Sequence, residues 1–116
     1  MSARLPGELI AARVAVMPNG DVAEIILTER TGPYRDRLSE AYAGWFGGGA
    51  WSAWHLVAEA VHDVSITADA SGQEPSALIA VVVWVPTPSG VIVANHDANQ
   101  LRHFRLTAAG LLPADL

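Results

Sequence analysis

The stretch WSAWHLVAEAVHD, residues 51–63, decides which fold class the sequence predicts. At about 100° per residue, its apolar side chains gather on one side of a helix. The polar side chains, among them His55, Glu59 and His62, gather on the other side. The apolar residues do not alternate with polar ones, as they do in a half-buried strand. The stretch therefore predicts an amphipathic helix.

The preceding segment, TGPYRDRLSEAYAGWF (31–46), has the same helical character. Pro33 suits a first helical position, because its missing N–H would have no partner there. Tyr42, Trp45 and neighbouring apolar residues fall in one arc opposite the charged residues. Three glycines, Gly47–Gly49, then predict the end of this helix, since glycine is a poor helix former.

A β-hairpin is predicted ahead of the two helices. Residues 12–17 and 22–29 are strand-like and flank the turn PNGD. Asn19-Gly20 favours the positive φ angles that tight hairpin turns require.

Strands are also predicted after the helices. A short strand near 65–69 precedes SALIAVVVWVPT (76–87), whose two faces are both apolar, and VIVAN (91–95) follows as another buried strand. The tail around LRHFRLT (101–107) fits either a helix or a strand, and we favour the strand. Apolar residues on both faces are typical of a central strand in a sheet that is covered on both sides.

Together these elements predict an α+β fold for a single domain of residues 1–116. An antiparallel sheet, built from the N-terminal β-hairpin and the C-terminal strands, carries two amphipathic helices packed on one face. Two helices shield only one face of the sheet. The other face then either curls around an interior, as in a half-barrel, or is buried against another copy of the chain.

The composition of the 116 residues excludes several classes of function. The chain has no cysteine, which excludes disulfides, thiolate zinc sites and cysteine nucleophiles. Its net charge of -5 makes a nucleic acid an unfavourable partner. The longest apolar run, residues 77–85, is too short for a membrane-spanning helix, and no signal peptide is evident. We therefore expect a cytoplasmic protein that binds neither nucleic acid nor membranes.

Three polar residues of the predicted second helix have the spacing of metal ligands. His55, Glu59 and His62 stand at i, i+4 and i+7, so on a helix they could reach one ion. A solvent-exposed helix face explains the same residues without an ion. We accordingly assign no metal and no cofactor, and keep these three residues as the candidate ligands.

Other residues are candidates for catalysis or ligand binding. The chain contains two His-Asp dipeptides, 62–63 and 96–97. His62, Asp63 and His96 are therefore the candidates that could supply a His/Asp acid–base pair. Aromatic side chains could line an apolar pocket, although ordinary core packing explains them as well. These aromatic candidates are Tyr42, Trp45, Trp54 and Trp84.

The sequence therefore favours a small non-catalytic interaction or assembly protein. It would act by forming a homodimer or by docking on a protein partner. The alternative is a small-ligand-binding half-barrel, or a cofactor-independent enzyme with a His/Asp acid–base pair in an apolar pocket.

Overall fold

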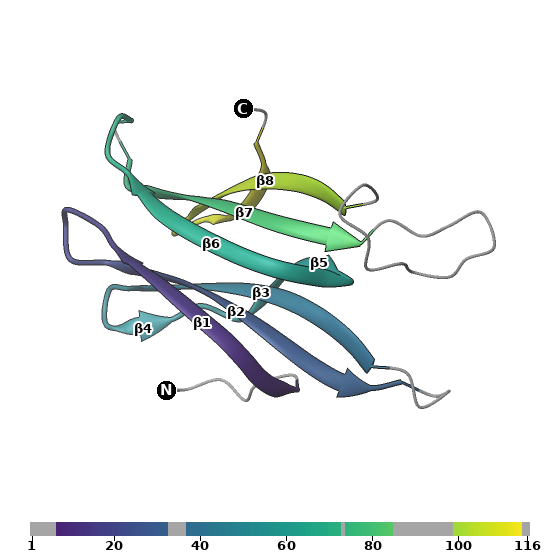
Figure 1. The fold of residues 1–116 in the computed structure, drawn as a ribbon. Helices are drawn as coiled ribbons and strands as arrows, with labels where there is room; N and C mark the ends of the chain where they lie inside the picture. The colour runs from purple at the N-terminus through teal and green to yellow at the C-terminus, as the bar shows by residue number, and fades with distance from the viewer. Residues whose placement is uncertain (1–6, 33–36, 73, 85–98, 115–116) are drawn as a thin grey trace.

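The computed structural model describes residues 7–32, 37–72, 74–84 and 99–114. These residues form an all-β structure of two antiparallel sheets and contain no helix (Figure 1). The predicted α+β fold with two helices on one face is therefore wrong. The two sheets lie one above the other and share one core.

Sheet A is the lower layer in Figure 1 and has five strands. Three long strands follow one another, and two short strands both pair with the far side of the third. The strands are β1 (Glu8–Val16), β2 (Val22–Thr31), β3 (Arg37–Gly47), β4 (Ala50–Trp51) and β5 (His55–Glu59).

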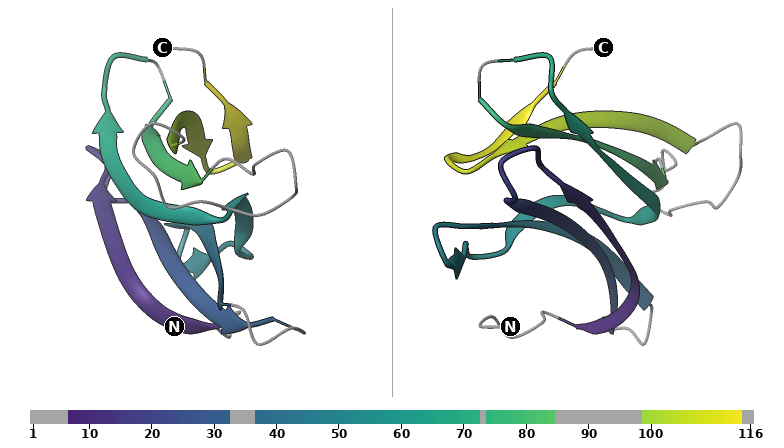
Figure 2. Two further views of the ribbon diagram at one scale, coloured as in Figure 1. Left: turned by 45° about the vertical axis from the view of Figure 1, so that its right-hand side comes forward. Right: turned by 90° about the vertical axis from the view of Figure 1, so that its left-hand side faces the viewer.

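Sheet B is the upper layer and has four strands in sequence order. Its first strand, β6, lies across β1 and β2, and both β1 and β6 lie on the same side of the molecule (Figure 2). The strands are β6 (Val61–Asp69), β7 (Ser76–Trp84), β8 (Asn99–Thr107) and β9 (Gly110–Pro113).

The hydrophobic core lies between the sheets and comes from alternate residues of their strands. Ala23, Ile25 and Leu27 of β2 face it from sheet A, whereas Ile79 and Val81 of β7 face it from sheet B. Many of the core residues of sheet A are alanines. Small side chains let the two sheets approach closely around the single large ring of Trp45, which is 4% exposed.

From Arg37 onward, the predicted helix over 31–46 is replaced by strand β3. Ala41, Ala43 and Trp45 face the core, whereas Tyr42 and Gly44 face away from it. This alternation coexists with the helical arc because apolar residues occupy both faces of the strand. The sequence is thus compatible with a helix or a strand. Pairing with β2 from Arg37 to Phe46 selects the strand, since the long-range partner overrides local helix propensity.

The predicted helix over 51–63 is replaced by β4, β5, a corner and the start of β6. Ala60 forms the corner with φ of 55°, and the chain passes there from sheet A to sheet B. Its N–H donates to the Ser39 carbonyl, and the Ser39 hydroxyl donates to the Val61 carbonyl. These bonds hold the corner in a conformation that an alanine rarely adopts.

Two β-bulges explain why this segment has helical periodicity. The register slips at Val57 in β5 and at His62 in β6, so the side-chain alternation changes phase at each point. As a result the buried residues of the segment are Val57, Ala58, Val61 and Val64. Their spacing of 1, 3 and 3 is the spacing that one face of an amphipathic helix would show.

The predicted strands that fall on described residues are confirmed, in contrast to the predicted helices. The N-terminal hairpin is present, and Gly20 in its turn has φ of 91°. The strand predicted over 76–87 is β7, which is central in sheet B, and the tail is the strand β8. Strand β9 was not predicted, and the strand predicted over 91–95 lies outside the described residues.

Candidate functional site

The outer face of sheet A, which points away from the core, is largely apolar. Val14 and Val16 of β1 and Leu56 of β5 are 58%, 63% and 47% exposed there. Ile26 lies on this face between Ala12 and Tyr42, and its neighbours bury it to 2% exposure. No second layer of described residues covers this face, so burial of this extent reflects close packing among neighbouring side chains.

Aromatic rings gather at one end of this face. Phe46 and Trp51 are cross-strand partners, with ring centroids 5.2 Å apart. The Trp54 ring lies over Gly44, where a Cβ atom would stand only 3.0 Å from a carbon of the ring. Glycine at this position of β3 thus leaves room for the ring.

The indole nitrogen of Trp54 has no hydrogen-bond partner among the described residues, although the atom is buried. A buried donor without an acceptor costs free energy.

One carboxyl group stands in the middle of the apolar surface. Glu24 lies between Val14 and Gly44 in the sheet register, with apolar neighbours along its own strand. Burial raises the pKa of Glu24 above its ordinary value, because the charged form loses hydration there. The ionised form of the carboxyl group is therefore destabilised in this apolar environment at neutral pH.

Polar side chains occupy the opposite end of the face. The Arg30 Nε donates to Glu40 Oε1 at 2.9 Å, and the Glu40 side chain is only 10% exposed. Burial and the nearby Glu40 carboxylate raise the pKa of Tyr42, so its phenol stays neutral. This ion pair limits the apolar surface to the part nearer Phe46 and Trp51.

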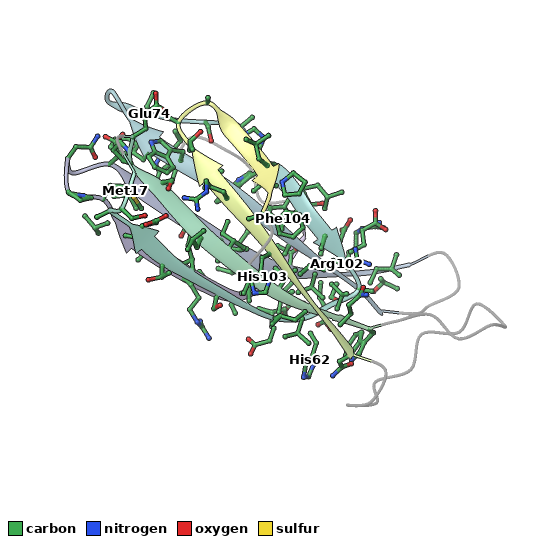
Figure 3. All side chains as sticks on the ribbon, turned by 90° about the horizontal axis from the view of Figure 1, so that it is seen from above. Met17, His62, Glu74, Arg102, His103 and Phe104 are labelled. Carbon is green, nitrogen blue, oxygen red and sulfur yellow. The ribbon has the colours of Figure 1, made fainter. Side chains whose placement is uncertain are left out.

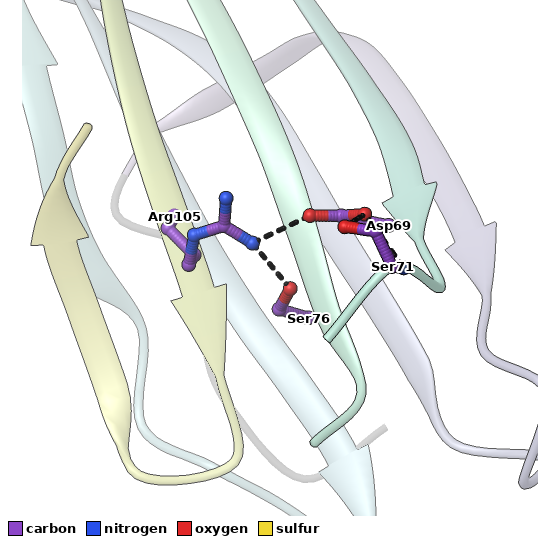
Figure 4. Close-up of polar contacts among 4 residues, drawn as sticks. All are labelled: Asp69, Ser71, Ser76 and Arg105. Atoms are coloured by element: carbon purple, nitrogen blue, oxygen red, sulfur yellow. Dashed lines mark hydrogen bonds and ion pairs between the residues drawn. The ribbon is translucent and has the colours of Figure 1, made fainter. Parts of the chain in front are cut away.

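The outer face of sheet B is more polar. Asp63, Ser65 and Thr67 of β6 are exposed on it, and its apolar residues are those of β7 together with Leu101 of β8 and Leu112 of β9, which are 57% and 62% exposed. Figure 3 looks down on this sheet and shows His103 near its middle and His62 near one end. At the other end Arg105 Nη1 donates to Asp69 Oδ2 and to Ser76 Oγ, both at 2.7 Å (Figure 4).

The three metal-ligand candidates do not share a face. His55 pairs with the core-facing Ala43, whereas Glu59 pairs with Glu40 on the outer face of sheet A. His62 lies beyond the corner, in sheet B. No cluster of three possible ligands occurs in the described part of the chain. The helical spacing that brought them together is absent, because the segment is extended.

The catalytic candidates lie on the surface. His62 is exposed at the β6 bulge, with its ring centroid 5.5 Å from that of Trp84. Asp63 is also exposed, and its Oδ1 accepts the Val64 N–H at 2.9 Å. His96 lies outside the described residues. The described residues thus place neither His62 nor Asp63 in an apolar pocket.

The four aromatic candidates are divided among three places. Tyr42 and Trp54 lie on the outer face of sheet A, and Trp84 lies on that of sheet B. Trp45 is in the core, where its Nε1 donates to Asp21 Oδ2 at 3.0 Å. They do not line one pocket, but two of them belong to the apolar outer face of sheet A.

Sequence reasoning missed the other members of this face, because it assigned Phe46, Trp51 and Leu56 to helices and so did not place them beside the hairpin strands. The signal was present in β2, where Val22, Ile26 and Thr28 alternate with the core residues. Comparisons with protein-family models, curated proteins and solved structures gave no match to the chain. Among the described residues no helix has the length and apolarity needed to cross a membrane.

Proposed function

We propose that this protein is a non-catalytic assembly protein, and that the outer face of sheet A associates with the same face of a second copy. One observation carries the proposal: sheet A is apolar on both faces, and only its inner face is covered by described residues. Contiguous exposed apolar surface of this kind is typical of association sites.

The chemistry of the face suits another sheet. Flat, closely spaced side chains on neighbouring strands let a second sheet pack about 10 Å away, as the two sheets of one molecule do. The aromatic group of Phe46, Trp51 and Trp54 supplies the large, rigid side chains that concentrate binding free energy. A second copy is a natural occupant, since twofold dimers are the commonest soluble oligomers.

A catalytic or ligand-binding role has less support. It would need a titratable group in an apolar cavity, whereas His62 and Asp63 are exposed. Glu24 is the titratable group nearest to the apolar surface, but no described second group stands ready to exchange a proton with it.

A matched pair of substitutions tests the proposal. Leu56 and Leu101 are similarly exposed, at 47% and 57%, but lie on the outer faces of sheets A and B respectively. Leu56→Lys should raise the dimer dissociation constant by about tenfold or more, because the interface would trap an unpaired ammonium group. Leu101→Lys should leave the constant unchanged.

Sedimentation equilibrium and native mass spectrometry give the dissociation constants, and urea unfolding confirms that both variants fold. A wild-type chain that stays monomeric at high concentration would refute the proposal. So would an equal effect of Leu56→Lys and Leu101→Lys, which would show that the outer face of sheet A has no special part.

A further inference from the structure

The strands at the sheet edges differ in how well they are protected against pairing with another strand. An edge strand exposes unpaired N–H and C=O groups, and proteins usually block it with bulges, charges, proline or short length. Strand β9 has four residues and ends at Pro113. Strand β5 has a bulge at Val57, and β6 combines a bulge at His62 with the carboxylates of Asp63 and Asp69.

Strand β1 has little of this protection. After a bulge at Ile10, residues 11–16 pair with β2 without irregularity. Most of β1 is exposed, and Val14 and Val16 are among its most exposed side chains. Arg13 is the single charged residue within the regular part, and its Nη1 donates to the Ala12 carbonyl at 3.0 Å, a bond with which strand pairing at Ala12 has to compete. In the described part of the chain no strand pairs with the free side of β1.

The sequence of β1 is compatible with pairing to itself. A twofold axis perpendicular to the sheet keeps every side chain on its own face and makes the two strands antiparallel. An axis through Val14 sets Val14 against Val14, Ala12 against Val16, and Arg13 against Ala15.

The two registers nearer the start of the strand are worse. An axis through Arg13 would place two arginines directly opposite each other, which is destabilising. An axis through Ala12 would place the bulged residue Ile10 opposite Val14 and interrupt the pairing. The register through Val14 avoids both faults.

We infer that β1 pairs antiparallel with β1 of a second copy, in the register centred on Val14, to form one continuous sheet. In this register Ala12, Val14 and Val16 of both chains share the outer face, so the apolar surfaces of the two copies merge. The inference goes beyond the proposed function, because the edge and the face are separate surfaces. Used together, their perpendicular twofold axes generate a closed tetramer.

Cysteine cross-linking tests the register, and the chain provides a clean background because it has no native cysteine. Directly opposed residues of antiparallel strands have Cα atoms about 4.5–5.5 Å apart, within the range that a disulfide bridges. Val14→Cys should therefore form a covalent dimer under mild oxidation. All variants also carry Leu56→Lys, so that contact between the outer faces does not bring the thiols together.

Ala12→Cys and Val16→Cys are the matched controls. Each alone should give little covalent dimer, since four residues of strand, about 13 Å, separate the two thiols. An equimolar mixture of the two variants should cross-link, because Ala12 of one copy faces Val16 of the other. Non-reducing electrophoresis and intact mass measure each product.

The outcomes separate the two proposals. Cross-linking of Val14→Cys, and of the mixture but neither control alone, supports edge pairing whether or not the outer faces associate. Equal cross-linking of all three single variants, or of none, overturns the edge register. In that case a wild-type dimer that Leu56→Lys weakens would still support the association of the outer faces.

Discussion

The two sheets have similar inner faces but very different outer faces. Both contribute alternating small and branched apolar residues to the common core. On the outside, sheet B carries polar side chains on β6 and β8 around the half-buried apolar residues of β7, and Leu101 and Leu112 are its exposed large apolar side chains. Sheet A instead carries apolar and aromatic side chains across neighbouring strands, with its ion pair displaced to one end. The folding core requires only inner faces, so the outer face of sheet A points to a partner.

The pKa values of two carboxyl groups reflect the same difference between the outer faces of the two sheets. Glu24 stands among apolar neighbours on sheet A, and burial raises its pKa. Asp69 stands on sheet B beside Ser71 and Arg105, whose hydrogen bonds hold its pKa well below the ordinary range. The sheet A environment opposes the negative charge, whereas the sheet B environment stabilises it.

The largest expected effect on stability comes from comparing alanine substitutions at an inner and an outer position of one strand. Ile79 faces the core from β7 at 1% exposure, whereas Val82 on the same strand is half-buried on the outer face. Ile79→Ala should lower the free energy of unfolding by about 2–5 kcal/mol, because it removes buried surface and leaves a cavity. Val82→Ala should cost less than about 1.5 kcal/mol. Urea unfolding measures both, and equal costs would mean that the outer face of sheet B is as fully buried as the core.

The next effect concerns the ring that covers β3 on sheet A. Gly44→Ala should lower the free energy of unfolding by about 1–3 kcal/mol, because the new methyl group pushes against the Trp54 ring. The near-ultraviolet circular dichroism should change as the ring moves. Gly72→Ala is the control, since its nearest neighbour would be a carbonyl oxygen 3.8 Å away. An unchanged spectrum for Gly44→Ala would place the Trp54 ring elsewhere.

A pH-dependent effect distinguishes Glu24. Because burial raises its pKa in the folded chain, ionisation destabilises the fold as the pH rises from the unfolded-state pKa through the folded-state value. Glu24→Gln should therefore raise Tm at neutral pH, with a gain that disappears on acidification to about pH 4. Thermal unfolding across this range measures the gain. A gain that stays constant with pH would exclude ionisation as its cause.

The smallest expected effect has the opposite pH dependence. The Asp69 pKa is lowered in the folded chain, so its stabilising contribution is present above about pH 4 and is lost as the pH falls through the folded-state pKa. Asp69→Asn should lower Tm slightly at neutral pH, and the difference from wild type should shrink in strong acid. Ser71→Ala, which removes one donor but keeps the Arg105 ion pair, should give part of the same loss.

Some elements of the fold follow directly from the local chemistry of the sequence. The Asn19-Gly20 turn and the alternating residues around it produce the N-terminal hairpin without reference to the rest of the chain. The continuous apolar run of β7 likewise indicates a central strand wherever it is placed. Two members of the candidate site, Tyr42 and Trp54, could also be named from sequence as aromatic ligand-binding candidates, but not the face that joins them.

The conformation of the region from Arg37 to Asp69 depends instead on long-range contacts. Its buried positions, such as Val57, Ala58, Val61 and Val64, suit a helix and a pair of bulged strands equally well in sequence. Pairing of β3 with β2, and of β6 with β7, selects the strands through bonds between residues far apart in the chain. Local periodicity carries no information about such partners, so the fold class and the candidate surface became visible only once both sheets were assembled.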